Sequence, residues 1–165
     1  MRSFLLRTAV SLALLLALVV PGLLAGIDNS CPVTKQPSPP FVPPAGYPQY
    51  QTPQGFWYGS DSLWTMVSPH PWRAGGNNGA KLTYYRRGFD WKSIDNLRLT
   101  VIGRRVDAFA PLVWSDGASS VSVDRSNAPG GMAMMTGIDI PTTGCWEISA
   151  HYVNQTLTYT IRVER

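Results

Sequence analysis

Copper sites on β-sandwich proteins use histidine, cysteine and methionine ligands. The chain offers these residue types at His70, His151, Cys145, Met132, Met134 and Met135. The spacing argues against such a site. A copper loop of that kind needs a histidine soon after the cysteine and a methionine just beyond, whereas His151 is a strand residue well downstream of Cys145 and no methionine follows it. We therefore expect neither a metal nor any other cofactor.

Hydrolytic chemistry needs a nucleophile beside a base, or two carboxylates across a cleft. The acidic side chains are scattered, mostly beside Ser or Gly, where they stabilise turns. They include Asp61, Asp90, Asp107, Asp116, Asp124 and Glu147. Neither G-x-S-x-G nor H-E-x-x-H occurs in the chain. We expect no catalytic residues and no enzyme activity.

The 6 tryptophans suggest recognition by aromatic surfaces. Trp57, Trp64 and Trp146 fall in predicted strands and are expected in the core. The others fall in predicted loops, where aromatic rings stack on sugars or partner proteins, or else cover an end of the domain. With a neighbouring arginine, these make the candidate ligand-binding set Trp72, Arg73, Trp91 and Trp114.

The elements that carry these residues are predicted to be β-strands. Residues 141–165 contain two runs of alternating apolar and polar side chains, which predict a hairpin with its turn at Asn154 and Gln155. A two-stranded ribbon is only marginally stable alone, so the rest of the domain must cover its apolar face. The residues predicted to face the core are Trp146, Ile148, Ala150, Tyr152, Leu157, Tyr159, Ile161 and Val163.

Further strands are predicted along the chain, giving about seven in all with turns at intervals of about ten residues. Pro111 argues that the weak strand over residues 106–113 lies at an edge, and Asp90 is placed to cap a short helical turn over residues 91–96. This pattern predicts an all-β fold, an antiparallel immunoglobulin-like β-sandwich. The remaining predicted strands are residues 56–58, 63–67, 81–89, 97–103 and 132–140, and the predicted long loops are residues 68–79 and 114–131.

Residues 1–26 have the pattern of a secretory signal, because two arginines precede an uncharged run over residues 8–27 that ends in small side chains. Cleavage is the preferred interpretation. Retention as a membrane anchor and lipidation at Cys31 are the alternatives, although Asp28-Asn29-Ser30 makes a poor lipidation site. We expect an exported protein, secreted or in the cell envelope, that touches the membrane only through residues 1–26 if these are uncleaved.

The charge balance excludes a nucleic-acid partner. The net charge of +4 falls to +2 without residues 1–26, because Arg2 and Arg7 lie there. The remaining arginines come as isolated pairs, which are explained more simply as solvated strand ends than as a phosphate-binding patch. These pairs are Arg86 with Arg87 and Arg104 with Arg105.

Residues 27–54 form a proline-rich arm before a domain at residues 55–165. Proline fixes φ and removes donors, so the arm should be extended. It could dock through residues 39–43 in another protein's aromatic groove, although a linker is the simpler interpretation. If the two cysteines pair, a third possibility is that the arm lies on its own domain. Its possible contact points are Phe41, Val42, Tyr47 and Tyr50.

Cys31 and Cys145 are the only cysteines, and an oxidising compartment favours their pairing over two unpaired thiols. In the chain-entropy model, closing this loop would stabilise the folded protein by at most about 4 to 5 kcal/mol. Because Cys145 lies on the strand face opposite Trp146, the bond would hold the N-terminal tail against the outer side or edge of the domain.

Three motifs resemble those of a group of uncharacterised exported bacterial proteins. They are Cys31-Pro32-Val33-Thr34, the Tyr58-Gly59-x-x-x-Leu63-Trp64-Thr65 block, and Gly144-Cys145-Trp146-Glu147 followed by the closing hairpin. The resemblance covers most of the chain after the signal. It implies a secreted or envelope location and pairing of the two cysteines, and it brings no activity, substrate or catalytic residue.

These observations lead to one expected function and two alternatives. We expect an exported, non-catalytic binding module whose partner is an envelope polysaccharide or an envelope protein. The first alternative is a cell-wall hydrolase, or an accessory subunit of one, that uses Asp90, Asp116 or His70. The second is a structural spacer on the cell surface, held away from the membrane by the arm.

Overall fold

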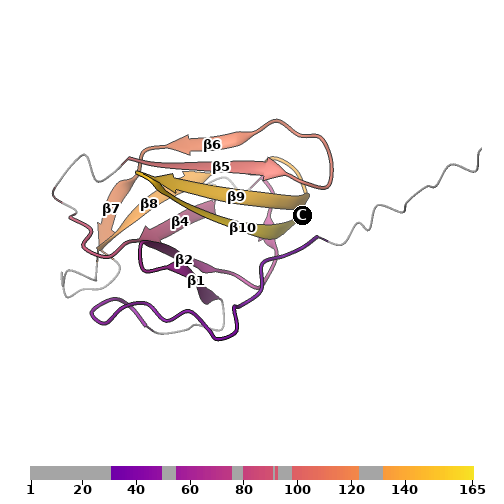
Figure 1. Ribbon diagram of the computed structural model, residues 1–165. Coiled ribbons are helices and arrows are strands. Elements are labelled where there is room, and N and C mark those ends of the chain that lie inside the picture. Colours follow the sequence, from indigo (N-terminus) through magenta and orange to yellow (C-terminus); the bar gives the residue numbers. More distant parts are fainter. Residues whose placement is uncertain (1–30, 50–54, 76–79, 91, 93–97, 123–131) are drawn as a thin grey trace, which may run out of the picture.

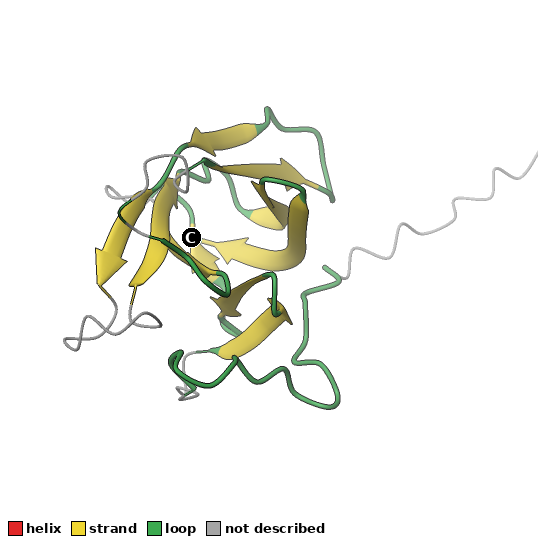
Figure 2. Cartoon of the chain, turned by 60° about the vertical axis from the view of Figure 1, so that its left-hand side comes forward, coloured by secondary structure: helices red, strands yellow, loops and turns green. Residues whose placement is uncertain are grey.

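A computed structural model describes residues 31–49, 55–75, 80–90, 92, 98–122 and 132–165. Figure 2 shows strands joined by loops, with no helix in this part of the chain, and so none that could cross a membrane. The strands are β1 (Phe56–Ser60), β2 (Leu63–Val67), β3 (Trp72–Arg73), β4 (Ala80–Tyr85), β5 (Leu99–Arg105), β6 (Val113–Asp116), β7 (Ser119–Ser122), β8 (Met132–Ile138), β9 (Gly144–Tyr152) and β10 (Gln155–Glu164).

The strands form two five-stranded sheets (Figure 1). One has the order β1-β2-β4-β8-β7 and the other the order β3-β10-β9-β5-β6. The pairs within both sheets are antiparallel except for the short parallel pair of β3 with β10. The prediction of an all-β fold is confirmed.

The C-terminal hairpin forms as predicted, and all eight residues assigned to its inner face are buried. Its turn is one residue earlier than predicted. Gln155 pairs with Tyr152, so the two turn residues are Val153 and Asn154. Val153 has a φ of 55°, a left-handed conformation that is rare for β-branched residues.

Three strands differ from the predicted pattern. The prediction of a strand over residues 106–113 is wrong. Residues 106–112 form a loop, and the edge strand β6 begins only at Val113. Pro111 lacks the N–H that a ladder needs. β3 lies within the predicted loop 68–79, and β7 and all of β6 except Val113 lie within the predicted loop 114–131. These segments lack a strong period of their own and are strands only because β10, β5 and β8 pair with them.

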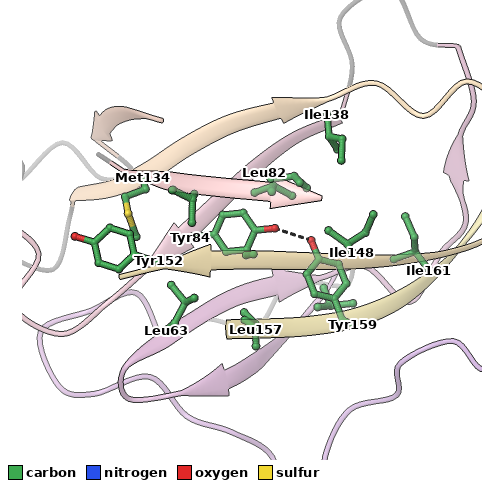
Figure 3. Close-up of a cluster of buried hydrophobic side chains, with 14 of the residues drawn as sticks. Leu63, Leu82, Tyr84, Met134, Ile138, Ile148, Tyr152, Leu157, Tyr159 and Ile161 are labelled. Atoms are coloured by element: carbon green, nitrogen blue, oxygen red, sulfur yellow. Dashed lines mark hydrogen bonds between the residues drawn. The ribbon is translucent and has the colours of Figure 1, made fainter. Parts of the chain in front are cut away.

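The main core lies between the two sheets, and a polar contact between two tyrosines crosses it (Figure 3). Tyr84 of β4 and Tyr159 of β10 meet there, with their hydroxyl oxygens 3.1 Å apart. Burial is the main cause that raises the pKa of both phenols above the ordinary value. Both hydroxyls therefore stay protonated at neutral pH, and one donates to the other across the inter-sheet space.

Residues 31–49 of the proline-rich arm cover part of the outer face of the β1-β2-β4-β8-β7 sheet, so the linker interpretation is wrong for this segment. Trp57, Trp64 and Tyr85 alternate with inner-face residues and form a second buried cluster. Phe41 and Tyr47 of the arm pack against it, and the Tyr47 ring stands edge-on to Trp64 at 4.9 Å. In Figure 1 this segment runs beside β1 and β2, on their far side from β9 and β10.

The arm is fixed at its first described residue. Cys31 is joined to Cys145 of β9 by a disulfide, which confirms the predicted pairing. Three residues later, the Thr34 N–H donates to Thr160 O at 2.9 Å and the Thr160 N–H donates to Thr34 Oγ1 at 2.8 Å. The N-terminal tail therefore follows the edge of β10, as the position of Cys145 predicted.

Removal of one hydroxyl from the tyrosine pair should cost more than removal of both. Tyr159→Phe leaves the Tyr84 hydroxyl buried without its partner, a loss of about 1 to 3 kcal/mol, whereas the double change Tyr84→Phe/Tyr159→Phe removes both polar groups and should be nearly neutral. Urea unfolding of the parent, both single variants and the double variant gives four free energies of unfolding, from which the interaction energy between the two hydroxyls follows. Strictly additive losses would show that the two hydroxyls do not depend on each other.

Candidate functional site

The two described tryptophans that were predicted to bind a ligand, Trp72 and Trp114, do not lie on one surface. Trp72 and Arg73 make up β3, at one edge of the β3-β10-β9-β5-β6 sheet. Trp114 lies on β6 at the opposite edge and is 69% exposed. Trp72 packs partly against the core, and Trp91 lies outside the described residues. The structure thus separates Trp72 from Trp114 by the full width of the sheet.

The acidic residues considered for hydrolysis are also apart, and most are engaged by neighbours. Asp61, Asp107 and Glu147 form ion pairs with Arg87, Arg105 and Arg104 respectively. Asp116 accepts a hydrogen bond from Thr100, and Asp90 accepts one from the Lys92 N–H. Asp124 and the predicted turn over residues 91–96 are not described, apart from Lys92. Within the described chain, no group of three His, Cys, Asp or Glu side chains could hold a metal ion.

A hollow of about 420 Å³ opens at one end of the domain, where three turns meet. The β1–β2 turn contributes Asp61 and Ser62, and the segment after β4 contributes Arg86 and Arg87. The β9–β10 turn supplies the remaining lining residues, which are Tyr152, Val153, Asn154 and Gln155. We call this hollow the arginine cleft.

Arg86 is held against the wall of the arginine cleft. Its Nη1 donates to the Tyr152 hydroxyl at 3.3 Å, and its Cζ lies 5.2 Å from the centre of the Tyr152 ring. The Tyr152 side chain belongs to the inter-sheet core. Such a cation–π contact restricts the guanidinium while leaving its charge intact.

Arg87 is the more exposed of the two arginines. Its Nη2 donates to Asp61 Oδ2 at 2.6 Å, between side chains that are 63% and 58% exposed. An ion pair this exposed contributes little to stability. A guanidinium has five N–H donors, and the contact with Asp61 uses one of those on Arg87. The cleft therefore holds two cationic groups and one carboxylate, with an excess of donors.

The proline-rich arm fixes the backbone that carries both arginines. The Tyr47 hydroxyl donates to Arg86 O at 2.9 Å and accepts from the Gly88 N–H at 2.7 Å. The same side chain packs on Trp64 beneath the arm. Tyr47 thus connects the outer aromatic cluster to the turn that presents Arg86 and Arg87.

This arrangement suits the recognition of anionic groups. Guanidinium groups present parallel N–H donors that match carboxylate and phosphate oxygens. Sequence reasoning assigned Arg86 and Arg87 to a solvated strand end and missed the cleft. The local signal was two adjacent cations directly after a strand and before Gly88. Nothing local indicated that two other turns would close around them.

Comparison with known protein families, with curated proteins and with solved structures finds no match to this chain.

Removal of the Tyr47 hydroxyl should loosen the arginine turn. Tyr47→Phe keeps the ring on Trp64 but removes both hydrogen bonds, so we expect a loss of stability of about 0.5 to 1.5 kcal/mol and faster amide exchange at Gly88. NMR hydrogen exchange measures the second effect. Tyr58→Phe is the control, because the Tyr58 hydroxyl makes no hydrogen bond within the described residues. Unchanged exchange at Gly88 in Tyr47→Phe would contradict this role of the arm.

Replacement of Val153 should relieve strain at the rim of the cleft. Asparagine tolerates a positive φ far better than valine does, so Val153→Asn is expected to stabilise the fold by about 1 kcal/mol, at the lower end of the cost of such a conformation. Val153→Ile is the matched control, since it remains β-branched and should bring no gain. Thermal unfolding of the parent and the two variants measures these changes in stability. An equal increase in stability in both variants would show that backbone strain is not the cause.

Proposed function

We propose that this protein is an exported, non-catalytic binding module of the cell envelope, and that the arginine cleft is its binding site. The ligand is an anionic polymer that carries carboxylate or phosphate groups. The observation that carries the proposal is the convergence of Arg86 and Arg87 with donor groups of two other turns in one hollow.

The geometry favours a polymer over a small enclosed molecule. The rim residues Asp61, Val153 and Asn154 are exposed, so the cleft is open to solvent and a chain can pass across it. Arg86 is already restrained against Tyr152, which lowers the entropy lost when it binds an anion. Asn154 adds an amide donor at the edge of the cleft.

Binding is assigned in preference to hydrolysis because of the carboxylates in the cleft. Asp61 is the single carboxylate among the residues that line it, and that carboxylate is engaged by Arg87. General acid–base hydrolysis of a glycosidic bond uses a pair of carboxyl groups that flank the bond. The lining residues supply one such group and two cations, a set suited to holding an anion.

The proposal includes export and an immunoglobulin-like β-sandwich. Export is supported by the signal-like pattern of residues 1–26 and by the disulfide, since such bonds persist mainly outside the cytosol. The finer fold assignment is supported by two mainly antiparallel sheets and by a core drawn from both. The resemblance to exported bacterial proteins in the three cysteine and tryptophan motifs points to the same location.

Polygalacturonate, a carboxylated polysaccharide, is the probe that tests the site, with uncharged dextran as the comparison. We expect the exported protein to bind polygalacturonate and not dextran at about 0.15 M salt, where the Debye length is about 8 Å. Arg86→Gln/Arg87→Gln removes two charge-assisted contacts worth about 1.5 to 3 kcal/mol each and should weaken binding at least about a hundredfold. Isothermal titration calorimetry measures the affinities.

The matched control is Arg104→Gln/Arg162→Gln, which removes the same charge from exposed residues outside the cleft. This control should bind within about twofold of the parent, since exposed charges further than a Debye length are largely screened. An equal loss in both double variants would show a general charge effect. A parent protein that binds polygalacturonate no better than dextran would refute the anionic ligand.

A further inference from the structure

The loop between β5 and β6 presents an apolar tip to solvent. Residues 106–112 read VDAFAPL, and Trp114 is the second residue of β6, which follows directly. Phe109 is 97% exposed, Leu112 60% and Trp114 69%. Isolated exposed apolar residues need no explanation, but several within nine consecutive residues indicate an interaction surface. We call Val106, Phe109, Leu112 and Trp114 the apolar tip.

The only charged residue of this loop is turned back toward the domain. Asp107 Oδ1 accepts from Arg105 Nε at 2.7 Å and Oδ2 accepts from the Cys145 N–H at 3.0 Å. The hydrogen bond from Arg105 lowers the pKa of the Asp107 carboxyl, the bond from Cys145 acts in the same direction, and burial opposes both. Asp107 thus braces the base of the loop as an anion, and residues 108–112 carry no charge.

The base of the apolar tip is bonded to the point where the chain enters the domain. The Val106 N–H donates to Cys145 O at 2.8 Å, so residues 106 and 107 hold both backbone groups of Cys145. Cys145 is in turn bonded to Cys31. In Figure 1 the β5–β6 loop and the first described residues both lie at the right-hand end of the domain.

The sequence before Cys31 brings a membrane close to the same place. The uncharged run of residues 8–27 ends four positions before Cys31. Four extended residues reach at most about 14 Å. Where this run lies in a membrane, as the proposed export signal does during export, the end of the domain that carries the apolar tip is held next to the lipid surface.

We propose that the apolar tip inserts into the interfacial region of a lipid bilayer and orients the domain on it. Phe, Leu and Trp side chains are those that partition into this region. β9 then leads away from the membrane, and its nine residues span about 27 Å at the usual rise per residue. The arginine cleft, at the far end of β9, faces away from the bilayer. Under this proposal, contact with the membrane is not confined to residues 1–26, as the sequence had suggested. The proposal does not depend on which ligand the arginine cleft binds.

The size of the apolar tip favours lipid over a second copy of the chain. Its two aromatic rings expose on the order of 400 Å² together, given 150 to 250 Å² for a fully buried ring. A stable protein interface buries about 800 Å² on each partner. A projecting loop of this size is therefore too small for a stable dimer contact, whereas a bilayer receives it without a shaped partner surface.

A fluorescent probe at two positions tests the orientation on vesicles. Ala108→Cys places a thiol beside Phe109, and Asn154→Cys places one at the cleft; both positions are exposed, and the native cysteines are already paired. Each exported protein is labelled with the environment-sensitive dye NBD. It is then mixed with vesicles of phosphatidylcholine, which carry no net charge to attract the arginine cleft, with and without nitroxide-labelled lipid.

We expect the dye at position 108 to shift to the blue and to be quenched by the nitroxide lipid, while the dye at position 154 stays unchanged. Phe109→Ser/Leu112→Ser in the Ala108→Cys protein should abolish most of the quenching, and Phe109→Leu should retain it. Equal behaviour at the two positions, or no association with vesicles, would overturn the proposal. A blue shift without nitroxide quenching would also overturn it, because it would place the tip against protein. None of these outcomes depends on polygalacturonate binding.

Discussion

The Cys31–Cys145 bond is the constraint on which both ends of the molecule depend. It fixes the first described residue to β9, and the hydrogen bonds of Thr34 then lead the chain along β10. From there the arm crosses to the outer face of the other sheet, where Phe41 and Tyr47 pack. A tether between residues 114 positions apart removes much of the freedom of the unfolded chain, which lets a proline-rich segment with few backbone donors remain in place.

The covered outer face explains an unusual feature of β2. Its sequence LWTMV is apolar almost throughout, and Leu63, Trp64, Thr65 and Val67 are all buried. A strand with one solvated face would alternate, so β2 must be covered on both faces. The inter-sheet core covers one side and the arm covers the other. Burial has a cost here, because the indole nitrogens of Trp57 and Trp64 are buried without a hydrogen-bond partner among the described residues.

The arm also connects two regions that lie far apart in the sequence. Tyr47 contacts Trp64 with its ring and the Arg86–Gly88 backbone with its hydroxyl. The arm therefore extends from the disulfide to the arginine turn, which it contacts through Tyr47. At the other end, Asp107 ties the apolar loop to the same cysteine. The domain thus has one end built around the disulfide and one built around two arginines.

The sequence by itself determined the strands whose period is strong and the pairing of its two cysteines. The β9–β10 hairpin follows from strict alternation, and the burial of Ile148 and Ile161 follows with it. The weak strands β3, β6 and β7 were not predictable, because neighbouring strands rather than their own residues decide them.

The arginine cleft, the covered face and the apolar tip were decided only by the tertiary structure. Arg86 and Arg87 become a site when two other turns fold beside them. Trp57 and Trp64 lie on the outer face of their strands, and they are buried there because the arm covers them. Phe109 is the converse case, a large apolar side chain that the fold leaves in solvent. Local pattern fixes which face of a strand a side chain occupies, whereas contacts distant in sequence fix what covers that face.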